Sequence, residues 1–417
     1  MRSKKVKKAI NWFKELPDTL FWWFYRKVLI RVKAARLRRK ERISVVFALS
    51  NLASWKTETL YRRMLEHPRF DPKLAIIIMR GKDSRAELKE YFDKQGYPYR
   101  ELTENETICD TLNPDIIFFQ HPYEGDCIPN HKFGRNRRAL FCYVIYSMRS
   151  STEEWATNVP MVNHCWQVYY ENRLNLETYR RLNRNHAVNG LATGLPVMDE
   201  MLIPKESVAD TWKPSAGKKR IIFAPHHTID PIDWMQLSTF MTTGPLMLEL
   251  AEKYSDRVQW AFKPHPWLRK KLETFWGKEA TDAYYNRWAQ MEWSQFEAGT
   301  YLGLFKHSDA MIHDCGSFTM EYLFTGNPVM YLERPGADYS TGYNEMHIRA
   351  HALHYHGQTR QDIEQFILNV INGVDPLKPE RERYRRDYLI PPGGQSATDN
   401  IIDAILSPRS AHKFSHF

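Results

Sequence analysis

Short apolar runs that alternate with longer amphipathic stretches restrict most strongly how this chain can fold. The first series of runs covers residues 43–49, 74–79, 116–120, 139–146 and 161–168, with amphipathic stretches near 57–65 and 84–94. Strands that alternate with helices form parallel sheets whose two faces are covered by those helices. The first half of the chain therefore predicts a doubly wound α/β domain.

A second series begins after a polar linker at residues 205–219. Its expected strands are 220–224, 258–263, 310–313 and 329–332, and its expected helices lie near 246–254 and 318–324. We therefore predict two Rossmann-like domains, at 43–204 and 218–390, followed by a C-terminal helix and tail at 391–417. In such sheets ligands bind beyond the carboxyl ends of the strands, so the residues just after each strand are the candidates for a site.

The basic charge of the chain is concentrated in residues 1–42. This segment holds 15 Lys and Arg against three Asp and Glu, whereas the remaining 375 residues carry 44 basic and 46 acidic side chains. A nucleic-acid-binding protein needs a basic face on its folded body. We therefore expect no nucleic acid among the partners.

The segment 1–42 is expected to be a basic, amphipathic helical arm. Its longest apolar run, residues 20–25, is far shorter than the roughly 20 residues that span a bilayer. Aromatic residues mixed with Lys and Arg suit the headgroup layer of an anionic membrane. The alternative is a solvated helix whose aromatic face packs on the body. The aromatic residues concerned are Trp12, Phe13, Phe21, Trp22, Trp23, Phe24 and Tyr25.

The cysteines indicate a reducing compartment. There are five of them, widely spaced and without a CxxC pair, which favours neither a disulfide framework nor a zinc site. Together with the arm, this predicts a peripheral protein on the cytoplasmic side of the cell membrane. The sequence also lacks GxGxxG, GxxxxGK[ST], HExxH and Asp-x-Asp motifs, which disfavours dinucleotide oxidoreductases, P-loop enzymes and metal-dependent single-Rossmann glycosyltransferases.

The first candidate site element is Lys263-Pro264-His265-Pro266, which follows an expected strand. The two prolines end the strand and stiffen the turn. His265 can then donate to a phosphate oxygen or move a proton near neutral pH, and Lys263 adds positive charge near a diphosphate. The alternative is a surface turn with an incidental histidine.

The second element follows the expected strand 310–313. Exposed amides at the start of the helix that follows favour an anion, and Gly316 permits close approach of a ligand. Ser317 either binds phosphate or only caps the helix, and Glu321 can accept hydrogen bonds from ribose hydroxyls. The donor-binding candidates of this element are Asp314, Gly316, Ser317, Phe318 and Glu321.

Further histidines follow two other expected strands. His226, His227 and Thr228 are candidate phosphate or base contacts, and we expect no metal there because no HxxxH spacing or carboxylate lies nearby. His121 is the candidate general base of the first domain, although a structural loop histidine explains it equally well. No cofactor is required by these residues. A divalent cation is compatible with them, but no ligand set demands one.

These elements together resemble the CDP-glycerol:poly(glycerophosphate) glycerophosphotransferases, which make teichoic acids and related capsule polymers. The resemblance rests on Lys263-Pro264-His265-Pro266, on the block from Ser308-Asp309 to Glu321-Tyr322, on Gly326-Asn327-Pro328-Val329, and on residues 190–196, which look like the family's T-G-x-P turn. It covers roughly residues 43–390. The family's first-domain histidine element has no counterpart at 143–149, and Cys315-Gly316 replaces two residues of its D-Y-S-S block.

The resemblance implies a GT-B-like fold, with two Rossmann-like domains facing a cleft. It implies that His265 and the Ser317 helix end hold the diphosphate of a CDP-alditol, and that Glu321 or Asp314 holds its nucleoside side. The expected reaction moves an alditol phosphate onto a lipid-linked or polymeric acceptor and releases CMP. The alternatives are a GT-B glycosyltransferase with a nucleotide-sugar donor and a membrane-tethered scaffold without activity.

Overall fold

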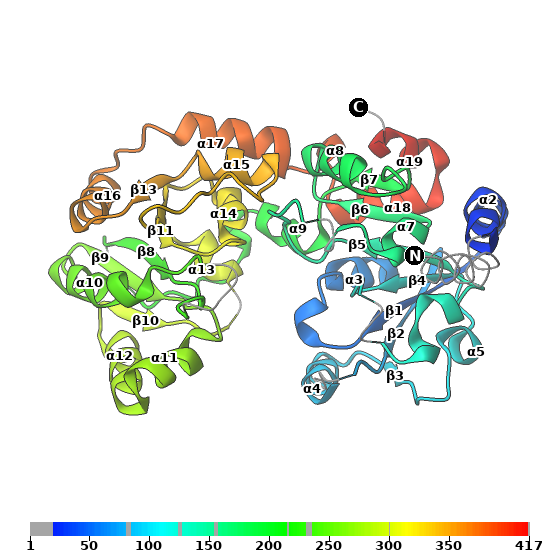
Figure 1. The fold of residues 1–417 in the computed structure, drawn as a ribbon, viewed down its shortest axis with the longest axis horizontal. Coiled ribbons are helices and arrows are strands. Elements are labelled where there is room, and N and C mark those ends of the chain that lie inside the picture. The colour runs from blue at the N-terminus through cyan, green and yellow to red at the C-terminus, as the bar shows by residue number, and fades with distance from the viewer. Residues whose placement is uncertain are drawn as a thin grey trace, which may run out of the picture. The chain divides into compact units, whose positions relative to one another are not determined.

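A computed structural model describes residues 20–80, 85–123, 127–153, 157–214, 217–230, 236–299 and 301–415 of the chain (Figure 1). Two compact units make up the protein. Unit 1 comprises Met1–Ser147, Glu153–Val197 and Pro391–Phe417, and unit 2 comprises Met148–Thr152 and Met198–Ile390. Among the described residues, no helix has the length and apolarity that crossing a membrane requires.

Unit 1 is built on a seven-stranded parallel sheet. Its strands run in the spatial order β3-β2-β1-β4-β5-β6-β7, so that the order reverses between β1 and β4. The strands are β1 (Ile43–Leu49), β2 (Phe70–Ile76), β3 (Tyr99–Glu101), β4 (Ile116–Phe119), β5 (Leu140–Val144), β6 (Gln167–Tyr170) and β7 (Gly190–Ala192).

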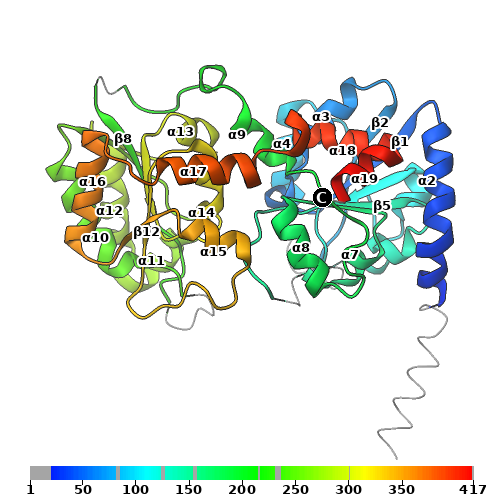
Figure 2. The same cartoon turned by 90° about the horizontal axis from the view of Figure 1, so that it is seen from above.

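The helices of unit 1 come from both ends of the chain. The C-terminal segment returns to this unit, where α18 packs on α3 and Asn400 donates to the carbonyl of Thr193 after β7 at 3.2 Å (Figure 2). The helices are α2 (Ile30–Arg39), which continues a helical turn at Tyr25–Leu29, α3 (Glu58–Glu66), α4 (Arg85–Gln95), α5 (Ile108–Leu112), α7 (Pro160–His164), α8 (Arg173–Leu182), α18 (Ala397–Leu406) and α19 (Pro408–Ser415). Helix α9 (Pro196–Leu202) contains the boundary to unit 2.

Unit 2 has a six-stranded parallel sheet in the order β10-β9-β8-β11-β12-β13, which reverses between β8 and β11. Buried aromatic side chains, among them Trp260, Phe262 and Trp288, fill its core. Its strands are β8 (Lys219–Ala224), β9 (Val258–Phe262), β10 (Ser294–Phe296), β11 (Ala310–His313), β12 (Val329–Leu332) and β13 (Tyr355–Gly357). Its helices are α10 (Phe240–Lys253), α11 (Leu268–Trp276), α12 (Lys278–Gln290), α13 (Leu302–Lys306), α14 (Phe318–Glu321), α15 (Glu345–His351), α16 (Arg360–Asn372) and α17 (Lys378–Tyr384).

The predicted fold class is confirmed, because both units are parallel α/β sheets of the Rossmann type. The strand predicted at 161–168 is misplaced. Pro160, whose fixed φ suits the first turn of a helix, starts α7, and strand β6 follows only at Gln167–Tyr170. Four strands escaped prediction, β3, β7, β10 and β13. Each has three residues, which is too short for an alternation of apolar and polar side chains to be recognised.

The expected arm is described from Leu20 onward, and residues 1–19, with Trp12 and Phe13, lie outside the described residues. Tyr25, Ala34 and Leu37 are buried on unit 1, and Tyr25 donates a hydrogen bond to the carbonyl of Ala139 at 3.1 Å. The helix therefore packs on the body by one face, as the alternative interpretation of the arm required. Its other face is considered below.

Gly190 in β7 provides a test of the packing of unit 1. A β-carbon at this position would lie 2.5 Å from Leu176 Cδ1 and 2.9 Å from the carbonyl oxygen of Ala187. We expect Gly190→Ala to lower the free energy of unfolding by about 1–3 kcal/mol, because the packed neighbours must move. Gly134→Ala is the control, since its nearest contact would be Arg137 Nη2 at 3.9 Å. Urea unfolding measures both, and an equal response of the two variants would contradict this packing.

Candidate functional site

The reversal of strand order in unit 2 lies between β8 and β11, and the candidate residues follow these two strands and β9. Parallel strands end at the same edge of a sheet, so the loops after them meet there. This edge, at a topological switch point, is where open α/β sheets bind ligands. The loops after these strands carry the candidate residues. They are His226, His227 and Thr228 after β8, Lys263 and His265 after β9, and the segment that begins with Asp314 after β11.

Three of the predicted residues form a cluster of imidazole rings. The ring centroid of His227 lies 4.4 Å from that of His226 and 4.2 Å from that of His265. The centroids of His226 and His265 are 5.0 Å apart. Trp267, which is 66% exposed, lies 5.3 Å from His227. Sequence analysis named the three histidines but missed Trp267, although an aromatic residue directly after Pro266 was a usable signal.

The surrounding hydrogen bonds decide which nitrogen of His265 carries the proton. The backbone amide of Trp267 donates to Nδ1 of His265 at 3.2 Å. An Nδ1 that accepts has no proton, so the neutral ring carries its proton on Nε2. His265 therefore offers an N–H donor on Nε2.

His226 has the same tautomer for a different reason. The hydroxyl oxygen of Thr228 accepts from the amides of Leu237 at 3.1 Å and Ser238 at 3.2 Å. Its own proton is left for Nδ1 of His226, which lies 3.0 Å away. His226 thus also presents an Nε2 donor. Thr228, which was predicted to contact a ligand, positions the ring of His226 in this structure.

This arrangement suits an anion better than a metal ion. The three histidines could each offer a nitrogen within 4.8 Å of the others, as a metal site requires. However, a metal needs the lone pair of the coordinating nitrogen, and the bonds to His226 and His265 place protons on Nε2. Burial lowers the pKa of His265 to about 4, so at neutral pH this ring is an uncharged donor.

Asp314, at the end of β11, lies beneath this cluster and is fully buried. One carboxylate oxygen accepts from the amide of His226 at 2.5 Å, and the other accepts from the amide of Thr239 at 2.6 Å and from its hydroxyl at 3.1 Å. Burial raises the pKa of Asp314 to about 6, although these bonds favour the anion. The structure places this residue as a support of the histidine loop, and its predicted contact with a donor stays a prediction.

Lys263 is buried beside the same edge. Its ammonium donates to the carbonyl of Gly299 at 2.7 Å, and burial lowers its pKa, against the attraction of Glu297. Lys263 was predicted to place positive charge near a diphosphate. In this structure its ammonium lies at the site but is hydrogen-bonded to a backbone carbonyl.

The predicted helix end after β11 has two distinct parts. Gly316 has room for a β-carbon, whose nearest contact would be Leu237 Cδ1 at 3.5 Å. Ser317 is exposed, precedes α14 and makes no capping hydrogen bond with its side chain. Capping, which was the alternative explanation for Ser317, therefore does not explain it.

The two larger side chains of this segment are packed. Phe318 contacts the ring of Phe305, with centroids 5.2 Å apart. Glu321 is buried, and its hydrogen bond to Tyr301 contributes to raising the pKa of that phenol, after burial itself. Tyr301 was not singled out from the sequence, and its distance along the chain from Glu321 left no signal that pairs the two.

In unit 1 the strand order reverses between β1 and β4, and His121 follows β4. The amide of Tyr123 donates to Nδ1 of His121 at 3.3 Å. The neutral ring then carries its proton on Nε2, which is the tautomer of a donor. His121 as the general base stays a prediction, because accepting a proton on Nε2 first requires exchange of this tautomer.

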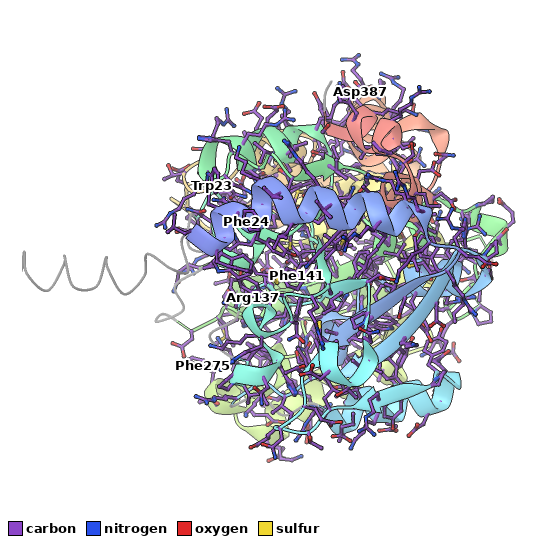
Figure 3. The ribbon with its side chains drawn as sticks, turned by 90° about the vertical axis from the view of Figure 1, so that its right-hand side faces the viewer. Trp23, Phe24, Arg137, Phe141, Phe275 and Asp387 are labelled. Atoms are coloured by element: carbon purple, nitrogen blue, oxygen red, sulfur yellow. The ribbon has the colours of Figure 1, made fainter. Side chains whose placement is uncertain are left out.

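Unit 1 also contains a pocket of about 620 Å³ beside the N-terminal helix, which we term the basic pocket. Arg137 lies beside that helix (Figure 3). Its guanidinium carbon is 4.4 Å from the ring centroid of Phe21 and 5.1 Å from that of Trp22. Sequence analysis did not single out this pocket, although the run of basic residues at 132–138 was a usable signal. The basic pocket is lined by Pro129, Lys132, Gly134, Arg135, Arg137 and Arg138.

No protein-family model and no curated protein matches the chain. Solved structures match over most of its length. A variant of the wall teichoic acid polymerase TagF with CDPG gives a TM-score of 0.58 at 11% identity, covering 97% of this chain and 98% of that one. The UDP-N-acetylglucosamine 2-epimerase of Listeria monocytogenes gives 0.56 at 13% identity, covering 89% and 97%. S. aureus MnaA with UDP gives 0.55 at 13% identity, covering 87% and 96%. At these identities the likeness shows a shared fold.

The support given by Asp314 can be tested through stability. An asparagine amide at this position would face a backbone N–H, so Asp314→Asn should lower the free energy of unfolding by about 1–3 kcal/mol at pH 7. The folded-state pKa of about 6 lies above the ordinary 3.8. The folded protein therefore binds this proton more tightly, and wild type loses that part of its stability as the pH rises from about 4 to about 6.

The difference in unfolding free energy between wild type and Asp314→Asn should accordingly shrink over this pH range and stay constant above it. Urea unfolding at each pH measures the difference. Asp256→Asn, at an exposed position, is the control and should remain within about 0.5 kcal/mol of wild type. A difference that grows as the pH rises would mean that the hydrogen bonds outweigh burial at Asp314.

Proposed function

We propose that this protein transfers an alditol phosphate from a CDP-linked donor to a cell-envelope acceptor, either a polymer or a lipid-linked precursor, and releases CMP. The observation that carries the proposal is the pair of Nε2 donors on His226 and His265 at the switch point of unit 2. Preorganised donors of this kind stabilise the charge on a diphosphate during transfer. The resemblance of Lys263-Pro264-His265-Pro266 and of the segment after β11 to the CDP-glycerol transferases supports the choice of donor.

In the proposed reaction an acceptor hydroxyl attacks the β-phosphorus of the CDP-alditol. A new P–O bond forms, the bond from this phosphorus to the bridging oxygen breaks, and CMP leaves with that oxygen. The hydroxyl proton passes to a base, for which His121 is the candidate. Little covalent help is needed, so positioning and charge stabilisation account for most of the catalysis. Ser317, which makes no cap, and the amide of Gly316 are proposed to contact the donor.

A GT-B glycosyltransferase that uses a nucleotide sugar is the second candidate. The same pair of donors would hold the diphosphate of such a substrate, and two of the matching structures are complexes with UDP and with UDP-GlcNAc. The third candidate is a scaffold without activity, favoured by the missing first-domain histidine element. Nucleotide release distinguishes the three.

The decisive measurement is nucleotide release by the purified full-length protein, offered CDP-glycerol, CDP-ribitol and a panel of UDP-sugars with a membrane-lipid extract. We expect CMP from a CDP-alditol. We expect His265→Ala to lower kcat about 10²–10³-fold, the usual cost of one such donor. His412→Ala, an exposed histidine on α19, is the matched control.

The other outcomes assign the protein differently. UDP released from a UDP-sugar makes the protein a glycosyltransferase. No release from any donor, with an extract known to contain acceptor, supports the scaffold. Unchanged CMP release in His265→Ala would remove this histidine from the mechanism.

We also propose that the N-terminal helix and the basic pocket hold the protein on an anionic membrane. Leu20, Phe24, Val28 and Val32 recur every four residues and are exposed, as is Trp23 at 55%. Residues at this spacing share one face of a helix. Basic side chains at Arg26, Lys27, Arg31, Arg36 and Arg39 are also exposed. An apolar stripe flanked by cations is the pattern of a helix that lies in the headgroup layer.

The membrane proposal predicts which side chains matter for binding. We expect Trp23→Ser with Phe24→Ser to weaken binding to phosphatidylglycerol-containing vesicles about tenfold or more, from the apolar area that no longer inserts. Lys132→Gln and Arg135→Gln should each weaken it about fivefold, because a basic residue near such a surface contributes about 1 kcal/mol. Vesicle co-sedimentation measures this.

The control is Phe275→Ser, a phenylalanine of unit 2 that is 45% exposed, as Phe24 is (Figure 3). It should bind as wild type does. Equal binding to phosphatidylcholine vesicles without anionic lipid would contradict the contribution of the basic pocket. Binding unaffected by the Trp23 and Phe24 changes would contradict that of the helix.

A further inference from the structure

A second group of titratable side chains in unit 2 shares no residue with the three-histidine cluster. Glu333 directly follows β12, His356 lies in β13, and His351 ends α15. The ligand atoms that these residues can offer all lie within 4.8 Å of one another. Neither the predicted site nor the proposed reaction uses any of them.

The distances within this group match a single bound ion. Glu333 Oε1 lies 2.8 Å from His356 Nδ1 and 3.7 Å from His351 Nε2. Ligand atoms of a tetrahedral zinc ion, at about 2.0–2.2 Å from the metal, are about 3.4 Å apart. The observed separations bracket this value, so an ion between the three atoms needs only small side-chain adjustments.

A hydrogen bond between Glu333 and His356 explains the contact of these two residues without a metal. It does not explain the state of His351. Its Nε2 is buried and has no hydrogen-bond partner among the described residues. A buried polar atom without a partner is costly, and a coordinated cation would give this nitrogen its partner.

The positions of all three side chains are fixed by rigid elements. The amide of Glu333 donates to the carbonyl of Gly357 at 3.0 Å, which ties the end of β12 to β13. Gln358 Nε2 donates to Glu333 Oε2 at 3.1 Å, and the other oxygen, Oε1, faces the two imidazoles. The ring of His351 stacks on Tyr339, with centroids 4.9 Å apart. Outer contacts of this kind orient the residues of metal sites.

We propose that Glu333, His351 and His356 bind a divalent transition-metal ion of the zinc class. Two imidazoles and one carboxylate form the ligand set of zinc sites that keep a fourth position open. Magnesium and calcium prefer oxygen ligands and do not fit this set. The ion would join α15 to the ends of β12 and β13, at the edge of the sheet where the three-histidine cluster also lies.

The two histidine groups of unit 2 thus differ in their chemistry. At the three-histidine cluster, the amide of Trp267 and the hydroxyl of Thr228 occupy Nδ1 of His265 and of His226, which leaves protons on the Nε2 atoms of these two rings. In the second group the carboxylate of Glu333 supplies negative charge and accepts from Nδ1 of His356 at 2.8 Å, so a bound cation would replace this proton. The buried Nε2 of His351 has no hydrogen-bond partner among the described residues. The first arrangement donates to an anion and the second accepts a cation.

The test uses the full-length protein after removal of metal with EDTA, titrated with Zn²⁺ against a chromophoric chelator and with Co²⁺ by visible absorption. We expect one tight equivalent and the intense d–d bands of a tetrahedral cobalt site. Gln358→Ala should weaken binding about 10–100-fold, as loss of an outer-shell partner does. His351→Ala and Glu333→Gln should abolish the tight equivalent.

His265→Ala is the matched control, because it removes a histidine of the other cluster and should leave the tight equivalent in place. The melting temperature of each metal-free variant shows whether it is folded, and Glu333→Gln, which keeps the shape of the side chain, decides if His351→Ala does not fold. Loss of the equivalent in His265→Ala with retention in Glu333→Gln would overturn the proposal. Zinc that binds only weakly, and equally to all variants, would also overturn the proposal.

Discussion

The carboxylate of Asp314 connects three segments of unit 2 that are far apart in the sequence. It extends from β11, accepts the amide of His226 after β8, and accepts the amide and hydroxyl of Thr239 before α10. These segments lie on both sides of the point where the strand order reverses, and their amides would otherwise be buried without partners. The geometry of the three-histidine cluster depends on this one group, because it holds the backbone from which His226 extends.

The chemistry of the histidines depends on their Nδ1 contacts more than on their proximity. Rings a few ångströms apart suggest a metal site at first sight. The amide of Trp267 and the hydroxyl of Thr228 determine, however, that His265 and His226 present protons. The same consideration makes His121 a donor in its neutral form. Two backbone amides and one hydroxyl therefore decide that His121, His265 and His226 act as donors.

The matching structures and the resemblance support the proposal at different levels. The structural likeness, at identities of 11–14%, establishes the Rossmann-type fold of the units. The choice of a CDP-alditol over a nucleotide sugar rests on Lys263-Pro264-His265-Pro266 and on the segment after β11. The membrane proposal is independent of both, because it rests on the exposed stripe and on the charges of the basic pocket.

The sequence by itself determined the α/β alternation, the two Rossmann-like series and the strand-end positions of His226, His265 and Asp314. These features are local, since a buried strand and the turn after it are encoded within about ten residues. The tertiary structure decided which side chains meet. Glu333 and His356 become neighbours through the register of β12 on β13, and folding gathers Pro129 and the basic run at 132–138 around one pocket. It also decided the tautomers, because a proton on an imidazole follows from the donors that packing places around the ring.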